Sequence, residues 1–206
     1  MRRMIAIALV ALGAATLSGC GGGPPIRYYT VELPVAPAQP ASGHPYSLLI
    51  GHIAAPEILR EEPIAYRTGK NEIGIYQYHF WVEPPVQMLR ITLVRMLRSS
   101  GKYQSVTELG SSAQGDYVLQ GRLYDFEEVD SAGGIAALVS MEFDLVDGRS
   151  RKTVWTHFYS HSEPVQGEDL PDVVSALDHN LTQGLNELES GLDGYIGSRA
   201  QAPGKS

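Results

Sequence analysis

The sequence is poor in positive charge and lacks the motifs that mark common catalytic sites. Its 206 residues include 16 lysines and arginines against 23 aspartates and glutamates, a formal charge of −7. This balance argues against nucleic acid as a partner, because phosphate backbones are bound through clustered basic side chains. The sequence has neither the GxxxxGK[ST] pattern of a phosphate-binding loop nor the GxSxG pattern of a nucleophile elbow. No catalytic residue is predicted, and any ATP hydrolysis would have to come from a partner.

Long hydrophobic runs are also missing. Arg2 and Arg3 precede an uncharged, mostly apolar stretch from Met4 to Leu17. As a helix these residues would reach only about 21 Å, well short of the ~30 Å hydrocarbon core of a bilayer. A basic start, a short apolar segment and small residues after it are typical of an export signal. We therefore predict that residues 1–19 target the chain and do not span a membrane.

Cysteine is nearly absent, and its position is informative. The single cysteine, Cys20, directly follows Leu17, Ser18 and Gly19. One thiol cannot form a disulfide framework, and a free thiol is a hazard in an oxidising compartment. A leucine, two small residues and a cysteine at the end of such a signal resemble a bacterial lipobox. In a lipobox the thiol is diacylglycerated, the signal is cut before the cysteine and the new amino group is acylated.

The lipobox resemblance implies that Cys20 is a lipid attachment site and that the acyl chains are the only covalently bound group, with no other cofactor. The alternative is a plain secretory signal followed by an incidental or buried thiol. Removal of residues 1–19 takes away two arginines and no acid, so the formal charge becomes −9. Anionic headgroups do not attract such a surface, and the acyl chains must supply the anchoring. Gly21 stands where an aspartate would resemble an inner-membrane retention signal, so we expect the periplasmic face of the outer membrane.

Proline, alanine and glycine mark the limits of one folded domain. The segment GGGPP after Cys20 is suited to a tether, residues 33–45 are rich in proline and alanine, and the last ten residues show no apolar periodicity. The chain therefore divides into four parts. They are a signal peptide (1–19), a lipidated tether with a short N-terminal strand and a Pro/Ala-rich linker (20–45), an α/β domain (46–196) and a disordered tail (197–206).

Apolar periodicity within the domain predicts a sheet and two helices. The clearest alternation of apolar and polar residues runs from 137 to 145, and Asp147-Gly148 after it is suited to a tight hairpin. Apolar stripes at helical spacing occupy residues 86–99 and about 170–195. We predict an α/β (α+β) two-layer sandwich, in which two amphipathic helices cover one face of a mixed, largely antiparallel sheet. The other predicted strands are 46–54, 72–81, 117–130 and 151–162.

Taken together, the order of segments resembles a known family. RYYTVELP, PEILREEPIAYRT, NEIGIYQYHFWVEPPVQML with its helix, DYVLQGRLYDFE and the long C-terminal helix are similar to the ABC-type transport auxiliary lipoproteins, the PqiC-like group. The resemblance runs from about Arg27 to Leu192. Its most specific part is Trp81, Glu83 and Pro84, together with Arg67 four residues before Asn71. In that family an arginine commonly precedes the tryptophan, whereas here Phe80 stands in that position.

This resemblance implies a non-enzymatic, lipid-anchored subunit of an envelope transport system. Such a subunit would work with a permease, an ATPase and a protein bearing an MCE (mammalian cell entry) domain to move lipids or other hydrophobic molecules between membranes. A homo-oligomer is possible within this hypothesis. A structural envelope lipoprotein that binds the cell wall or a protein scaffold is the alternative, and an enzyme on the same anchor is a third.

Two groups of polar residues are candidate sites. His157 and His161 with Glu163 could suggest a metal site, but along a strand their α-carbons would lie roughly 13 Å apart, too far for one ion. We predict no metal site there. Asp116, Asp125, Glu127 and Glu128 could contain a carboxylate pair, although the favoured interpretation is a solvated strand edge.

The first helix suggests where a partner would bind. If its apolar stripe of Val86, Leu89, Leu93, Met96 and Leu97 faces the sheet, a rotation of 100° per residue places four other side chains together on the outward side. Arginine and methionine are enriched where proteins meet. Trp81 could add a docking corner, although a tryptophan before a helix more often packs beneath it. The candidate partner-binding residues are Met88, Ile91, Arg95, Arg98 and Trp81.

Overall fold

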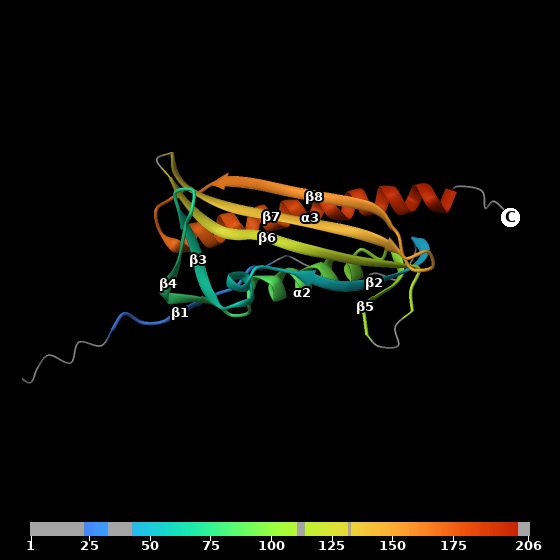
Figure 1. The fold of residues 1–206 in the computed structure, drawn as a ribbon, viewed down its shortest axis with the longest axis horizontal. Helices are drawn as coiled ribbons and strands as arrows, with labels where there is room; N and C mark the ends of the chain where they lie inside the picture. Colours follow the sequence, from blue (N-terminus) through green and yellow to red (C-terminus); the bar gives the residue numbers. More distant parts are fainter. Residues whose placement is uncertain (1–22, 33–42, 111–113, 132, 202–206) are drawn as a thin grey trace, which may run out of the picture.

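The computed structural model describes residues 23–32, 43–110, 114–131 and 133–201. One large sheet carries two long helices on a single face (Figure 1). The elements in chain order are β1 (Arg27–Tyr29), β2 (His44–Ala54), the 3-10 helix η2 (Glu57–Arg60), β3 (Pro63–Thr68), β4 (Glu72–Trp81), α2 (Pro85–Ser99), β5 (Tyr103–Glu108), β6 (Tyr117–Ser131), β7 (Gly134–Asp147), β8 (Thr153–Pro164) and α3 (Leu170–Gln201).

Strand β6 organises the sheet. Along one edge it pairs antiparallel with β7 over its whole length, and β7 pairs antiparallel with β8. Its other edge is shared, because β2 pairs parallel with its first half and β3 pairs parallel with its end. Beyond these lie β5, parallel to β2, and β4, antiparallel to β3, with β1 parallel to β4 at the margin. The predicted mixed sheet is confirmed.

The β6–β7–β8 meander follows from strict alternation. Ala137, Val139, Met141, Phe143 and Leu145 are each 0% exposed, and the polar residues between them point to the other face. The turn after β7 is longer than the predicted tight hairpin. The Asp147 carboxylate accepts hydrogen bonds from the backbone N–H groups of Arg149 (3.1 Å) and Ser150 (2.7 Å), so the side chain builds the turn.

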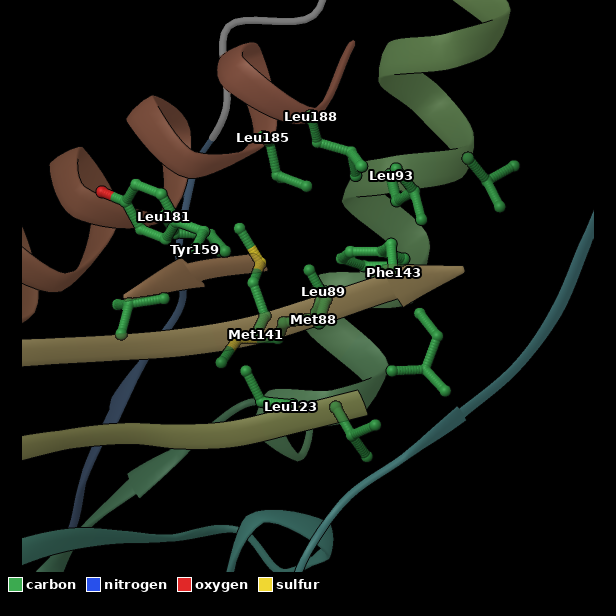
Figure 2. Packing of buried hydrophobic residues seen from close by; sticks show 14 of the residues in the cluster. Met88, Leu89, Leu93, Leu123, Met141, Phe143, Tyr159, Leu181, Leu185 and Leu188 are labelled. Carbon is green, nitrogen blue, oxygen red and sulfur yellow. The ribbon is translucent and has the colours of Figure 1, made fainter. Parts of the chain in front are cut away.

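The two helices share one core above the sheet, as predicted. Figure 2 shows Leu93 of α2 close to Leu188 of α3, with Phe143 of β7 beneath them. The stripe on α3 is fully buried, from Leu177 through Leu192 to Ile196. Because these side chains recur every three or four residues, one face of a long helix can cover the meander. None of the helices in the described parts of the chain has the length and hydropathy of a membrane span.

One polar residue fixes α3 to the sheet. Asn180 is 0% exposed, and its side-chain amide donates to the carbonyl oxygens of Ala137 on β7 (3.0 Å) and His161 on β8 (2.9 Å). The Tyr159 hydroxyl donates to its Oδ1 atom at 2.6 Å. A buried amide with all of these partners adds specificity that apolar contacts lack, because only one position of the helix satisfies every group.

Some boundaries differ from the sequence prediction. Strand β2 begins at His44, inside the predicted linker, because His44 pairs with Tyr103 and its imidazole bonds Asp193 of α3 at 2.7 Å. Helix α3 continues to Gln201, so the first part of the predicted tail is helical. Strands β3 and β5 were not predicted at all. The predicted signal peptide, Cys20 and most of the predicted linker lie outside the described residues.

Candidate functional site

The predicted partner-binding arc on α2 is only partly at the surface. The structure places Arg95 and Arg98 at the exposed face and leaves Ile91 half-buried. The prediction for Met88 is wrong, because its side chain is 5% exposed and lies beside Leu89 in the core (Figure 2). The buried face of α2 is wider than its apolar stripe implies, because η2 also packs against this helix.

Arg98 is committed to the fold. Its Nε atom donates to the carbonyl oxygen of Val106 on β5 at 2.9 Å, which ties the end of α2 to that strand. Of the predicted arc, the exposed Arg95 and the partly exposed Ile91 therefore remain as candidates for binding a partner. Two side chains make a small surface, and binding at this place stays a prediction.

Trp81 lies in the core, so the prediction that it forms a docking corner is wrong. The side chain is 1% exposed, and its ring packs against Phe126 of β6 with 5.4 Å between centroids. The backbone N–H of Trp81 donates to the Glu62 carbonyl at 2.7 Å, and Val82 donates to that of Tyr29 at 2.8 Å. These bonds hold the end of β4 between two neighbouring segments, with the tryptophan in the core cluster. The structural interpretation of Trp81 is the right one.

The acidic residues of β6 do not lie on a solvated strand edge, contrary to the favoured interpretation. Strand β6 is flanked on both sides, and Glu127 and Glu128 are only 3% and 6% exposed. Because they are consecutive on a strand, their side chains point to opposite faces of the sheet. They cannot act together as an acid and base pair.

Each buried glutamate has its own partner from β3 or β4. Arg67 Nε donates to Glu127 Oε1 at 2.6 Å, and the Tyr76 hydroxyl donates to Glu128 Oε2 at 2.8 Å. Burial raises the pKa of Glu127, although the Arg67 guanidinium opposes this shift. Burial also raises the pKa of Glu128, with the Tyr76 hydrogen bond acting in the opposite direction and the charge of Asp130 adding to the increase. Both contacts join the β3–β4 hairpin to β6, which is a structural role.

Asp116 is likewise occupied locally. Its Oδ2 atom accepts hydrogen bonds from the backbone N–H (2.9 Å) and hydroxyl (2.8 Å) of Ser47, and these bonds lower the pKa of the Asp116 carboxyl below its usual value. A hollow of about 550 Å³ lies beside this pair, at the end of the sheet where β6 begins. Its lining combines Asp116 with Arg149 and Arg151 from the β7–β8 turn.

The histidines of β8 do not form a metal site with Glu163. Glu163 instead binds the imidazole of His179 on α3 at 2.8 Å, and His157 stacks on Trp155 at 5.7 Å between ring centroids. Burial lowers the pKa of His157, which favours the neutral ring. Among the residues that the structure describes, no group of three histidine, cysteine or carboxylate side chains could hold a metal ion.

The face of the sheet opposite the helices exposes an aromatic pair that sequence reasoning missed. A β-bulge between Leu123 and Asp125 turns Tyr124 outward, where it lies 6.3 Å from Phe158 of β8. These side chains are 37% and 58% exposed. The Arg122 guanidinium lies 5.8 Å from the Tyr124 ring centroid. The signal available in the sequence was Phe158 at an outward position of β8, but nothing local predicts the bulge.

Fold and surface together define a two-layer α/β domain in which Glu127, Glu128 and Asp116 each bind a partner within the fold. The chain belongs to the ABC-type transport auxiliary lipoprotein component family, whose model matches residues 29–188. This confirms the predicted family. A lipoprotein family implies a lipid-anchored protein of the cell envelope, and an auxiliary component implies association with a transport system.

Solved structures agree with this assignment. Protein XCC0632 from Xanthomonas campestris is 25% identical, with a TM-score of 0.70, and the match covers 84% of this chain and 99% of that one. A second crystal structure, of an uncharacterized protein, is 19% identical with a TM-score of 0.64 and covers 82% and 99%, which shows the fold alone. No curated protein sequence matches the chain.

Proposed function

We propose that this chain is a lipid-anchored, non-catalytic auxiliary subunit of an ABC/MCE-type envelope transport system that moves lipids or other hydrophobic molecules between membranes. The anchor is acylated Cys20, and the site of action is the periplasmic face of the outer membrane. The observation that carries this proposal is the family match over residues 29–188, which takes in α2, the first part of α3 and every strand except the first two residues of β1.

The described side chains are consistent with a non-catalytic role. The carboxylates that could have formed a reactive pair are committed to Arg67, Tyr76 and Ser47, each of which joins separate parts of the sheet. His157 of β8 stacks on Trp155, and the backbone carbonyl of His161 accepts a hydrogen bond from Asn180 of α3. These structural contacts account for the burial of the polar residues, so a catalytic role is not needed to explain it.

Co-purification from native membranes tests the transport assignment. An affinity tag is placed at the C-terminus of the full chain, expressed from its own locus and extracted in mild detergent. Mass spectrometry is expected to find an MCE-domain protein, a permease and an ATPase enriched together. Recovery of the chain with the cell-wall sacculus, and without any of these three proteins, would overturn the proposal in favour of a structural envelope lipoprotein.

The partner-binding part of the proposal concerns α2. A photo-crosslinking residue at Ile91 or Arg95 is expected to trap the MCE-domain protein in living cells. Gln183 is the matched control, because it is an exposed residue on the other helix. Adducts of equal yield at Gln183, or none at α2, would show that the outward face of α2 is not the docking surface.

A further inference from the structure

A two-stranded ribbon at the margin of the sheet has one inward and one outward face. Strands β1 and β4 pair parallel, with Tyr28 opposite Phe80 and Tyr29 opposite Trp81. Because side chains alternate along a strand, Tyr29 and Trp81 point toward the core, and their neighbours in the sequence point away from it. Tyr29 confirms this direction, since its hydroxyl bonds His79 on the same side at 2.9 Å.

The outward face of this ribbon is apolar and accessible. Ile26, Tyr28 and Val82 are 57%, 64% and 56% exposed, and the rings of Tyr28 and Phe80 lie 5.9 Å apart. Phe80 is half-buried on this side, and Tyr78, two residues before it, is also half-buried. Apolar side chains in such a group differ from the isolated ones that are common on soluble proteins. We call Ile26, Tyr28, Tyr78, Phe80 and Val82 the ribbon patch.

The lipid-bearing end of the chain begins beside this patch. Gly23 lies so close to Tyr78 that a Cβ atom added to the glycine would be 3.9 Å from the tyrosine hydroxyl. Cys20 is three residues earlier in the sequence. Three residues span at most about 11 Å even when fully extended. An acyl group on Cys20 therefore enters the membrane within a short distance of the ribbon patch, whatever path residues 20–22 take.

We propose that the ribbon patch rests on the same bilayer that holds the acyl chains, with its aromatic rings at the level of the lipid headgroups. This inference depends on the acylation of Cys20 in the proposed function. Tyrosine is enriched at membrane interfaces, because its ring contacts acyl chains while its hydroxyl stays hydrated. The tether also keeps the patch at a high effective concentration next to the lipid, so even a weak apolar contact is populated.

Because net charge does not attract the domain to the lipid, the attraction at the ribbon patch is apolar. The mature chain carries a formal charge of −9, so the domain as a whole is not attracted to anionic headgroups.

Contact at the ribbon patch would also orient the domain. Strand β1 lies near one end of the long axis and the β7–β8 turn near the other (Figure 1). That turn, with Arg149 and Arg151, would point away from the membrane.

Site-directed spin labelling of the full acylated chain tests this arrangement. The Cys20 thiol is consumed by acylation, so one added cysteine gives a single label. Val82→Cys probes the ribbon patch, and Phe158→Cys is the matched control, because the two side chains are 56% and 58% exposed. The chains are reconstituted into vesicles of phosphatidylethanolamine and phosphatidylglycerol that contain no other protein.

The label at Val82 is expected to be several-fold less accessible to a water-soluble nickel reagent than the label at Phe158, and more accessible to oxygen. Adding Tyr28→Glu should restore nickel access at Val82, because a buried carboxylate opposes contact with lipid. Adding Ser160→Glu, an exposed position on β8, should leave the Val82 label protected.

Two outcomes would overturn the inference. Equal nickel access at Val82 and Phe158 on a chain that floats with the vesicles shows that the ribbon patch does not touch lipid. Dipolar broadening between Val82 labels that disappears on dilution with unlabelled chain, while nickel access stays low, shows that a second copy covers the patch. A chain that fails to float has lost the acyl anchor instead. That result would contradict the proposed function and is distinguishable from both.

Discussion

Replacing Asn180 by alanine removes three side-chain hydrogen bonds from a site that is 0% exposed. Each such bond contributes about 1 kcal/mol net, and the carbonyl groups left behind on β7 and β8 lose their buried donors. We expect the free energy of unfolding to fall by about 3 kcal/mol. With a urea dependence of roughly 2 kcal/mol per molar, the midpoint would move down by about 1.5 M.

The assay is urea unfolding of an unacylated chain that begins at residue 21, followed by far-ultraviolet circular dichroism. Gln183→Ala is the control on the same helix, because the Gln183 bond to Glu187 (3.1 Å) is exposed and its loss should be nearly neutral. Asn180→Asp should be at least as damaging as alanine at neutral pH, since it aims a carboxylate at two carbonyl oxygens. A loss below about 1 kcal/mol for Asn180→Ala would refute the idea that this amide fixes α3 to the sheet.

Three further outcomes follow from the sequence and the contacts. Cys20→Ala should release the chain from membranes after a high-salt wash, and a variant that still pellets would contradict the lipobox. Glu128→Gln should raise thermal stability at pH 7–8 while keeping the Tyr76 bond. The raised folded pKa of Glu128 means that the wild type loses stability as pH rises above the usual value of 4.5 and through the folded pKa, so the variant's advantage should vanish below that range. Gly184→Ala should lower the free energy of unfolding by roughly 1–2 kcal/mol in chemical denaturation, because the new Cβ would lie 2.7 Å from the ring of Tyr159. This loss is expected although alanine has the better helix propensity. A gain in stability would show that the core relaxes easily.

Local patterns predicted the elements whose burial is regular. The alternation in β7 and the stripe on α3 both survive in the structure, because each element buries one face against one layer. Strand β5 has no such signal, since only Tyr103 and Val106 are buried, at a spacing of three rather than two. Strand β3 buries the consecutive residues Ile64 and Ala65, which a period of two cannot represent.

The predictions for the candidate residues were wrong where contacts with residues distant in the sequence determine the environment of a side chain. Glu127 and Glu128 have the local sequence of a solvated strand, but their partners Arg67 and Tyr76 are 60 and 52 residues away in the chain. Met88 was wrongly predicted to be exposed for a similar reason. Helical periodicity gives the direction of a side chain, but it does not show which other elements pack against the helix. Neither the packing of η2 against α2 nor the flanking of β6 on both edges can be inferred from local spacing.

The three-residue length of β1 also determines how the domain bears mechanical load. A pull from the membrane through residues 20–26 enters the fold at Arg27 and acts first on the short pairing of β1 with β4. That pairing breaks under less force than the β6–β7 pairing, which runs the length of both strands. Release of β1 up to the buried Val31 would extend the reach from Cys20 from about 25 Å to about 40 Å. Strand β1 therefore yields before the core and takes up relative displacement of the membrane while the helices stay packed on the sheet.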